Sequence, residues 1–272
     1  MNAAKLTEEV KMDWAKLAEE GKTDWAKLAE EGKTDWAKLA EEGKTDWAKL
    51  AEEGKTDWAK LAEEGKTDWA KLTEEVNSYG CALTPPVLAP EECEEIAGLY
   101  DEVGLFRSTI DMERHRFGAG QYRYFSRPFP PLVERLRAEF YPRLLPIARD
   151  WAARLGRPAP WPDDLDEWLD MCHRAGQTRP TPILLRYGRD DWNALHRDLY
   201  GDLVFPLQVV IGLDRPGEDY TGGEFLLVEQ RPRAQSRGTV TLLPQGHGLI
   251  FTTRDRPVRS SRGWSASPVR HG

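Results

Sequence analysis

The first 76 residues repeat one pattern of apolar and polar positions every eleven residues. Three turns of an α-helix span about 10.8 residues, so an eleven-residue period keeps one stripe of side chains nearly in line. Leu17 and Ala18 lie within about 60° of Trp14 on such a helix, and the charged side chains lie opposite. The pattern predicts a long amphipathic helix over residues 5–76. The unit reads WAKLAEEGKTD, with tryptophans at Trp14, Trp25, Trp36, Trp47, Trp58 and Trp69.

A glycine in each unit allows a second interpretation. Gly21 and its counterparts each cost about 1 kcal/mol relative to alanine inside a helix, and Gly-Lys-Thr-Asp can end one helix and begin another. Helices of about eight residues are marginal unless they pack, so we favour one helix kinked at the glycines. Trp69, Leu72 and Val76 are expected to dock on the following domain. The earlier tryptophans form an apolar stripe, for which we expect self-association or packing against the rest of the chain.

Beyond residue 76 the pattern becomes that of an α+β domain. Apolar residues at helical spacing predict helices over residues 90–103, 130–155 and 165–175. Short apolar runs bounded by glycine and proline predict strands at 79–83, 181–187, 203–213, 223–229, 237–243, 248–253 and 264–270. We therefore expect a domain over 77–272, with helical support in 88–178 and a core of strands in 179–272.

Composition changes at the same point. Residues 1–76 contain 13 lysines, no arginine and 20 acidic residues, whereas residues 77–272 contain 25 arginines, no lysine and 26 acidic residues. This switch places a domain boundary near Asn77. No stretch has the roughly 20 apolar residues of a membrane span, and the N-terminus is too charged for a secretory signal. Cys81, Cys93 and Cys172 lack zinc spacing, which favours reduced thiols and a cytoplasmic protein.

A histidine and an aspartate two residues apart, His196 and Asp198, follow an apolar strand. In an extended segment, residues i and i+2 project to the same side, so both side chains can bind one metal ion. A second histidine would complete the two-histidine, one-carboxylate set of non-haem Fe(II) oxygenases. The spacing also fits a surface turn, but buried strands on both sides favour a site. The distal ligand has two candidates, His247 and His271, which lie 51 and 75 residues after His196.

Residues 114–125 interleave arginines with aromatic residues. Arg116, Tyr122 and Tyr124 are candidate substrate contacts, since such segments hold a nucleobase by stacking and guanidinium contacts. A hairpin that buries its rings and exposes its arginines is the competing interpretation, which the pattern favours. The net charge of −1 over residues 77–272 argues against duplex DNA, because nucleic-acid binders usually carry a basic surface. A small molecule or a protein side chain stays open as the substrate.

From about Trp69 to the last residue, the chain resembles a bacterial family of Fe(II)- and 2-oxoglutarate-dependent oxygenases. That family is described, largely by analogy, as AlkB-like and active in oxidative DNA dealkylation. The resemblance implies a double-stranded β-helix (jelly roll) core with flanking helices, and Fe(II), 2-oxoglutarate and O₂ as cofactor and cosubstrates. Three stretches carry it: RYGRDDWNALHRDLYGDLVFPLQV, GEDYTGGEFLLVEQRPRAQSR and RPVRSSRGWSASPVRHG.

The resemblance also implies site residues. It makes His196, Asp198 and the histidine of Arg-His-Gly, His271, the metal ligands, with no catalytic residue beyond them. Tyr187 matches a tyrosine that related dioxygenases use to bind 2-oxoglutarate, and Asn193 is placed to orient the first ligands. Family members continue past Arg-His-Gly through a strand with an arginine for 2-oxoglutarate, whereas this chain stops at Gly272. We therefore expect a truncated chain that lacks the last strand and binds 2-oxoglutarate weakly.

Three functions fit these features. The first, which we favour, is a dioxygenase that hydroxylates or oxidatively dealkylates a substrate, with damaged nucleic acid among the candidates. The second is a catalytically lapsed metal-binding jelly roll whose helical repeat mediates self-association. The third is a jelly-roll binding module without redox chemistry, which leaves the His-x-Asp…His set unexplained.

Overall fold

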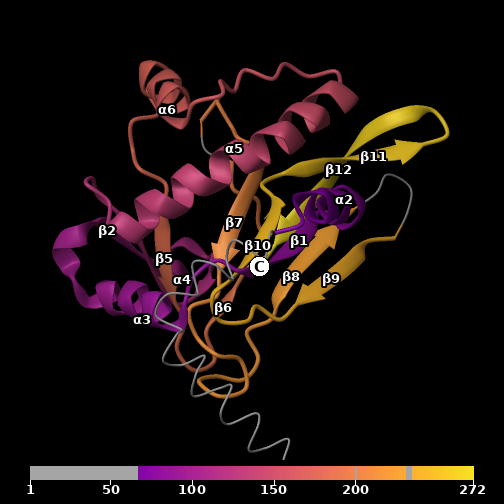
Figure 1. Ribbon diagram of the computed structural model, residues 1–272. Helices are drawn as coiled ribbons and strands as arrows, with labels where there is room; N and C mark the ends of the chain where they lie inside the picture. The colour runs from indigo at the N-terminus through magenta and orange to yellow at the C-terminus, as the bar shows by residue number, and fades with distance from the viewer. Residues whose placement is uncertain (1–66, 200, 231–234) are drawn as a thin grey trace, which may run out of the picture. The chain divides into compact units, whose positions relative to one another are not determined.

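The computed structural model describes residues 67–199, 201–230 and 235–272 (Figure 1). The chain divides into two compact units, Met1–Lys66 and Thr67–Gly272. All described residues belong to the second unit. The eleven-residue repeat and the helix predicted over residues 5–76 lie outside the described residues, apart from the end of that helix.

The end of the predicted repeat helix is α2 (Trp69–Tyr79). The carboxylate of Asp68 caps it by accepting a hydrogen bond of 2.9 Å from a backbone N–H of the first turn, and a glycine in the left-handed conformation follows its last residue. Leu72 and Val76 are buried, and Trp69 packs beside them. The predicted docking of these three side chains is confirmed. The helix crosses the composition change at residue 77 and forms part of the second compact unit.

The remaining helices flank a set of short strands. The helices are α3 (Pro90–Gly98), the one-turn α4 (Met112–His115), α5 (Pro131–Arg154) and α6 (Leu165–Arg174), with 3₁₀ turns η1 (Leu99–Asp101) and η2 (Val103–Leu105). The strands are β1 (Cys81–Pro86), β2 (Phe106–Asp111), β3 (Gly118–Ala119), β4 (Gln121–Phe125), β5 (Ile183–Arg186), β6 (Trp192–Asn193), β7 (Leu207–Ile211), β8 (Phe225–Glu229), β9 (Arg237–Thr241), β10 (His247–Thr252), β11 (Asp255–Ser260) and β12 (Gly263–His271).

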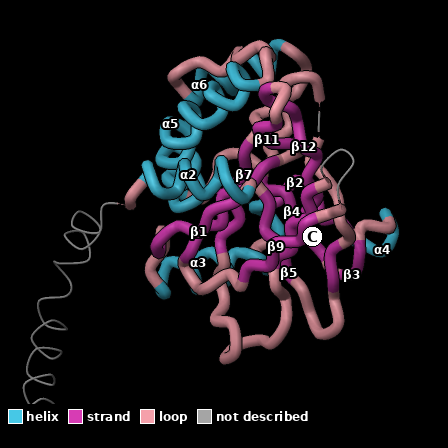
Figure 2. The backbone as a smooth tube through the Cα atoms, turned by 90° about the vertical axis from the view of Figure 1, so that its right-hand side faces the viewer, coloured by secondary structure: helices cyan, strands magenta, loops and turns pink. Residues whose placement is uncertain are grey.

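The strands pair in antiparallel sheets. One sheet has the order β1-β10-β7 and a second has the order β11-β12-β8-β9. A third sheet has the order β2-β4-β5, and β3 pairs with β6. Helices α2, α5 and α6 gather on one side of the strands, while α4 projects on the other side (Figure 2).

Side-chain alternation along β10 shows how the layers pack. Ile250 faces a core cluster with α2 and α5, which includes Trp151. Its neighbours Leu249 and Phe251 face the opposite way, into a cluster with Leu227 of β8 and its neighbours on β12. The sheet β1-β10-β7 is therefore covered by helices on one face and by the second sheet on the other. Burial on both faces explains why this strand reads as a continuous apolar run.

The structure differs from the predicted division between support and core. The segment 88–178, predicted as helical support, also contributes β2, β3 and β4. Strand β1 lies before that segment and pairs with β10 inside the core sheet, whereas the core was predicted to begin at residue 179. These pairings join segments far apart in the chain, which local patterns do not report. The helix predicted over 90–103 ends at Gly98 and continues as 3₁₀ turns, and β11 lies where no strand was predicted.

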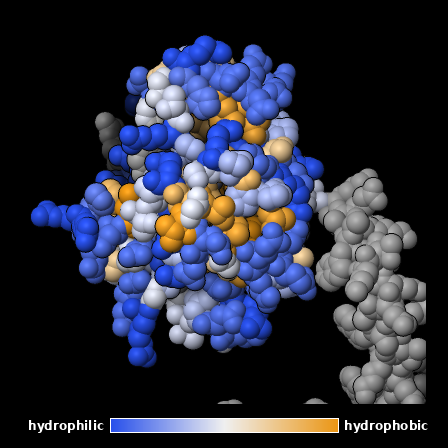
Figure 3. All heavy atoms as spheres, turned by 90° about the vertical axis from the view of Figure 1, so that its left-hand side faces the viewer, coloured by the Kyte–Doolittle hydropathy of each residue, from blue (hydrophilic) through white to orange (hydrophobic). Residues whose placement is uncertain are grey.

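None of the helices in the described part of the chain is long and apolar enough to cross a lipid bilayer. The surface on the side of α3 and β2 is mostly polar, with apolar side chains gathered near its middle (Figure 3). Val103 of η2 is 69 % exposed and Ile183 of β5 is 38 % exposed. Single exposed apolar residues of this kind are common on soluble domains.

Candidate metal centre

A single backbone bridge brings the two ends of the candidate site together. The N–H of His196 donates to the carbonyl of His271 at 2.9 Å, and the N–H of His271 donates back to the carbonyl of His196 at 3.0 Å. His271 is the last residue of β12, and its other edge pairs with Leu227 of β8. The bridge therefore adds the segment around His196 to the sheet, next to β12. Because directly opposed residues share a face, the two imidazoles project to the same side.

Asp198 lies between the two imidazoles. Its Oδ1 atom is 3.3 Å from Nε2 of His196, and its Oδ2 atom is 3.2 Å from Nε2 of His271. The centroids of the two imidazole rings are 4.3 Å apart. One ligand atom from each residue lies within 4.8 Å of the other two. The structure thus gathers the three predicted side chains at one point.

The two histidines set the protonation of the carboxylate. Burial by itself would raise the pKa of Asp198, but hydrogen bonds and favourable charge interactions with His196 and His271 outweigh it and hold that pKa well below its usual range. The hydrogen bond with Asp198 in turn raises the pKa of His196 above its ordinary value, against the opposing effect of burial. Asp198 is therefore an ionised, acceptor-only group at neutral pH, as a metal ligand must be.

Neighbouring groups fix the orientation of both rings. Nδ1 of His196 is 2.7 Å from the carbonyl oxygen of Ala194, which leaves Nε2 directed at the carboxylate. Phe225 stacks on the ring of His271 with 8° between the planes, and Phe251 meets it edge to face. Nδ1 of His271 is buried without a hydrogen-bond partner among the described residues. Sequence reasoning missed these contacts, because a backbone carbonyl and apolar strand residues carry no local signal of their own.

The donor set fits a first-row transition metal. Two imidazole nitrogens and one carboxylate on the same side of a sheet form the arrangement typical of non-haem Fe(II), which leaves other coordination positions open. The side chain of His271 is 6 % exposed, while those of His196 and Asp198 are 34 % and 27 % exposed. One side of the group is therefore closed by protein and the other remains open to an incoming molecule.

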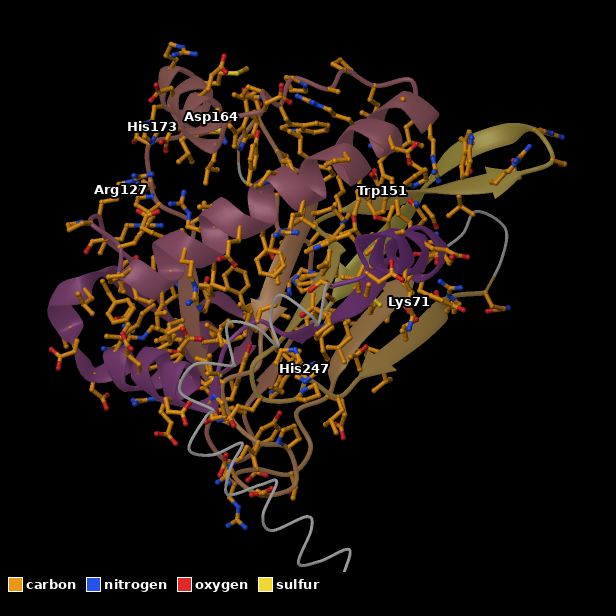
Figure 4. The ribbon with its side chains drawn as sticks, in the orientation of Figure 1. Lys71, Arg127, Trp151, Asp164, His173 and His247 are labelled. Atoms are coloured by element: carbon orange, nitrogen blue, oxygen red, sulfur yellow. The ribbon has the colours of Figure 1, made fainter. Side chains whose placement is uncertain are left out.

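His247, the other candidate for the distal ligand, lies elsewhere. It begins β10 (Figure 4), and its Nδ1 is 2.8 Å from the carbonyl oxygen of Thr84. It is absent from the group of potential ligands formed by His196, Asp198 and His271. The structure brings His271 to the cluster and leaves His247 in the pairing of β10 with β1.

Tyr187 and Asn193, the predicted cosubstrate contacts, lie next to each other. Burial raises the pKa of Tyr187 to about 12, with hydrogen bonding to Asn193 acting in the opposite direction, so the phenol stays protonated at neutral pH. Asn193 pairs with Gly118 in the β3–β6 ladder. A Cβ atom on Gly272 would lie 2.9 Å from the carbonyl oxygen of Asn193. Asn193 is thus adjacent to the end of β12 and to the cluster.

The predicted substrate segment divides into parts with different surroundings. Tyr122 and Tyr124 lie on one face of β4, with ring centroids 5.5 Å apart and an edge-to-face arrangement. Arg123 points the other way, donates to the carbonyl of Tyr100, and lies over the ring of that residue. Arg116 is exposed in the left-handed conformation after α4. The competing hairpin interpretation is therefore wrong for Arg123, which is packed against protein.

Comparison with known proteins identifies a family match over the second half of the chain. A family described as "Oxygenase, catalysing oxidative methylation of damaged DNA" matches residues 120–272. These residues include β4 through β12 and all three members of the histidine–aspartate cluster. The match covers more than half of the chain.

Two curated relatives come from Mycobacterium tuberculosis. They are the uncharacterized protein MT2286 of strain CDC 1551 / Oshkosh and the uncharacterized protein Rv2227 of strain ATCC 25618 / H37Rv, each 72 % identical over 148 residues. That alignment covers 54 % of this chain and 64 % of each relative, so the chain spans less than two thirds of their length. A solved prolyl-4-hydroxylase from Pseudomonas putida gives a TM-score of 0.45 at 11 % identity, over 75 % of this chain and 94 % of that chain. This structural similarity is too weak to transfer a fold or a function.

Proposed function

This chain belongs to the oxygenase family matched over residues 120–272, and on that premise we propose that it is an Fe(II)- and 2-oxoglutarate-dependent oxygenase. The observation that carries the proposal is the convergence of His196, Asp198 and His271 within 4.8 Å of one another. We assign the sheets β1-β10-β7 and β11-β12-β8-β9 to the two faces of a double-stranded β-helix. The family description favours damaged nucleic acid as the substrate.

In this proposal His196 and His271 bind Fe(II) through Nε2, and Asp198 supplies the carboxylate oxygen. Iron with 2-oxoglutarate and O₂ would supply the oxidation of a C–H bond, with CO₂ and succinate as by-products. The protein contributes ligand geometry and a site closed on one side. Phe225 and Phe251 hold the imidazole of His271, and the carbonyl of Ala194 holds that of His196. Such outer contacts orient metal ligands and exclude water.

We assign Tyr187 and Asn193 to the cosubstrate. Their hydrogen bonding to each other and the closeness of Asn193 to the end of β12 support this assignment. A protonated phenol and a carboxamide both donate hydrogen bonds that a carboxylate accepts. Arg116, Tyr122 and Tyr124 remain our candidates for substrate contacts beyond the metal, because the first is exposed and the two tyrosines share one face of β4.

Metal retention tests the proposal most directly. The chain is prepared without oxygen, loaded with Fe(II), dialysed, and its iron content is measured. We expect Asp198→Ala and His271→Ala to abolish retention, because each removes one of the three proposed protein ligands. His247→Ala is the matched control, since it removes an imidazole that lies outside the cluster, and we expect it to retain iron.

Succinate release then tests the chemistry. The iron-loaded chain, given 2-oxoglutarate, O₂ and an alkylated single-stranded oligonucleotide, should release succinate in step with loss of the alkyl group. Iron binding without succinate would support the catalytically lapsed metal site instead. Loss of iron by the His247 variant together with its retention by the His271 variant would overturn the ligand assignment.

A further inference from the structure

A pocket of about 270 Å³ opens on the face of the sheet opposite to the metal cluster. Its polar lining consists of Arg197, Arg270, Gln230 and Ser236, and Leu195 contributes to its apolar part. Side chains alternate between the two faces along a strand. The pocket is therefore lined by residues that adjoin the metal ligands in the sequence. Their side chains point away from the metal.

The backbone register places the two arginines side by side. His196 and His271 are opposed across a pair of hydrogen bonds in an isolated bridge. Arg197 and Arg270 are the next positions on the two segments, and both line the same pocket. Arg270 also opposes Val228 of β8, which opposes Gly238 of β9. The row therefore runs Arg–Arg–Val–Gly across the neighbouring segments.

Two like charges directly across a ladder destabilise a sheet. The ion pairs formed among residues 67–199, 201–230 and 235–272 include neither Arg197 nor Arg270. Both arginines are exposed at the mouth of a concave site. A bound anion would relieve their repulsion and accept hydrogen bonds from two planar forks, a geometry that suits phosphate oxygens.

The anion proposed for this pocket is a different molecule from the cosubstrate of the proposed oxygenase, because the two would bind on opposite faces of the sheet. A molecule that chelates a metal between His196, Asp198 and His271 lies on the other face of the sheet, and the strands separate it from the guanidiniums. A polymer, in contrast, can contact both faces by passing round the edge of the sheet. The segment that carries His196 lies beside β12 on the side away from β8, and we infer that the polymer passes round this side.

We propose that Arg197 and Arg270 form a phosphate-binding pocket for the backbone of a single-stranded nucleic acid whose neighbouring base reaches the metal centre. This inference rests on the proposed oxygenase function for the identity of the substrate. A base inside a duplex is shielded, so enzymes that modify bases act on single strands or extrude the base. A phosphate held on the outer face fixes the strand while the base enters from the edge. The small net charge of the domain is consistent with a local contact of this kind and not with a broad basic surface.

Oligonucleotide binding without metal tests the pocket separately from the chemistry. The affinity of the full chain for a fluorescent single-stranded oligonucleotide is measured over a series of salt concentrations. We expect Arg197→Gln/Arg270→Gln to weaken binding by at least about tenfold, since each lost hydrogen bond to a charged group accounts for about that factor. The slope of log K against log salt should fall in magnitude by about 0.7, because the pocket holds one phosphate and each phosphate contact to a single strand contributes about 0.7.

Two further variants make the test specific. Val228→Glu places a carboxylate beside Arg270 without removing either arginine, and we expect it to weaken binding as the double variant does. Arg174→Gln/Arg262→Gln removes the same number of charges from exposed positions on α6 and in the turn between β11 and β12, and should bind as the unaltered chain does. Circular dichroism and cobalt(II) binding check that each variant keeps its fold and its cluster.

The outcomes separate the two proposals. Unchanged binding in the pocket variants, or equal losses in the control pair, would overturn the pocket. Displacement of the oligonucleotide by oligoglutamate at matched charge would overturn phosphate in favour of an acidic peptide. If the arginine variants lose the oligonucleotide but the unaltered chain neither retains iron nor releases succinate, the pocket stands and the oxygenase proposal fails.

Discussion

A buried carboxylate, Glu229 on β8, binds two arginines in the described structure. Its Oε2 accepts hydrogen bonds from Arg256 at 2.8 Å and from Arg237 at 2.9 Å. The side chains of Glu229 and Arg256 are 4 % and 3 % exposed. Arg256 also donates to the backbone carbonyl of Asn77 in α2. The side chain of Asn77 in turn accepts a hydrogen bond from the indole N–H of Trp151, which lies on α5 (Figure 4). These hydrogen bonds around Glu229 connect α2 and α5 to the sheet that carries the candidate metal centre.

We predict that Glu229→Gln lowers the free energy of unfolding by about 3–5 kcal/mol, the usual cost of removing one partner from a buried ion pair. The substitution keeps the shape of the side chain, so the loss arises from the charge and not from a cavity. Most of it should come from Arg256, which is almost fully buried. Arg237 is 39 % exposed, and solvent screens its share.

Urea denaturation followed by circular dichroism measures this loss. The control is Asp101→Asn, which breaks an exposed pair with Arg186 whose side chains are 81 % and 55 % exposed, and it should change stability by less than about 1 kcal/mol. The reasoning is refuted if the two variants lose the same amount. Adding Arg256→Met to Glu229→Gln removes the buried guanidinium and should recover part of the loss; no recovery would show that the guanidinium was not the source.

Three shorter predictions follow. Val76→Ala removes fully buried atoms between α2 and α5 and should cost roughly 2–3 kcal/mol in the same urea assay. Hydrogen bonding to Arg135 holds the pKa of Glu92 below its usual value despite the opposing effect of burial. The stability that ionised Glu92 adds to the folded chain is therefore present above the unfolded-state pKa and is lost as pH falls through the lower folded-state pKa. Glu92→Gln keeps an acceptor for the N–H of Ala89 but loses the charge paired with Arg135, and should accordingly cost less than about 1 kcal/mol at pH 7, with a difference from the unaltered chain that shrinks on acidification. Phe225→Leu frees the ring of His271 and should weaken cobalt(II) binding about tenfold in a spectroscopic titration.

Local pattern was sufficient to predict the long helices. The ranges 130–155 and 165–175 correspond to α5 and α6, because amphipathic periodicity, the proline at the start of α5 and the capping aspartate before α6 are local properties. Strand positions were also predicted closely where apolar runs are bounded by turns. The pairing of β1 with β10 was not predicted, since it joins segments separated by most of the domain. The segment before β4 also gave no reliable signal, because its aromatic and basic residues fit a strand and a surface loop equally well.

The site shows the same division between local and distant information. His-x-Asp spacing fixes the shared direction of His196 and Asp198, but no spacing rule separates His271 from His247. The deciding feature is the backbone bridge between His196 and His271, a product of the whole fold. The opposed arginines were missed for the same reason. Once the bridge is known, their position follows from simple alternation.

The bridge also couples the two faces of the sheet. The register that turns the imidazoles of His196 and His271 inward turns Arg197 and Arg270 outward, because side-chain direction has a period of two residues. A slip of β12 by one residue against β8 would replace His271 with Arg270 on the inner face and remove both features together. Three consecutive pairs, ending at His271 opposite Leu227, oppose such a slip, and burial of Val269 beside His271 adds to them. The positions of His196 and His271 in the candidate metal centre are therefore set by sheet register.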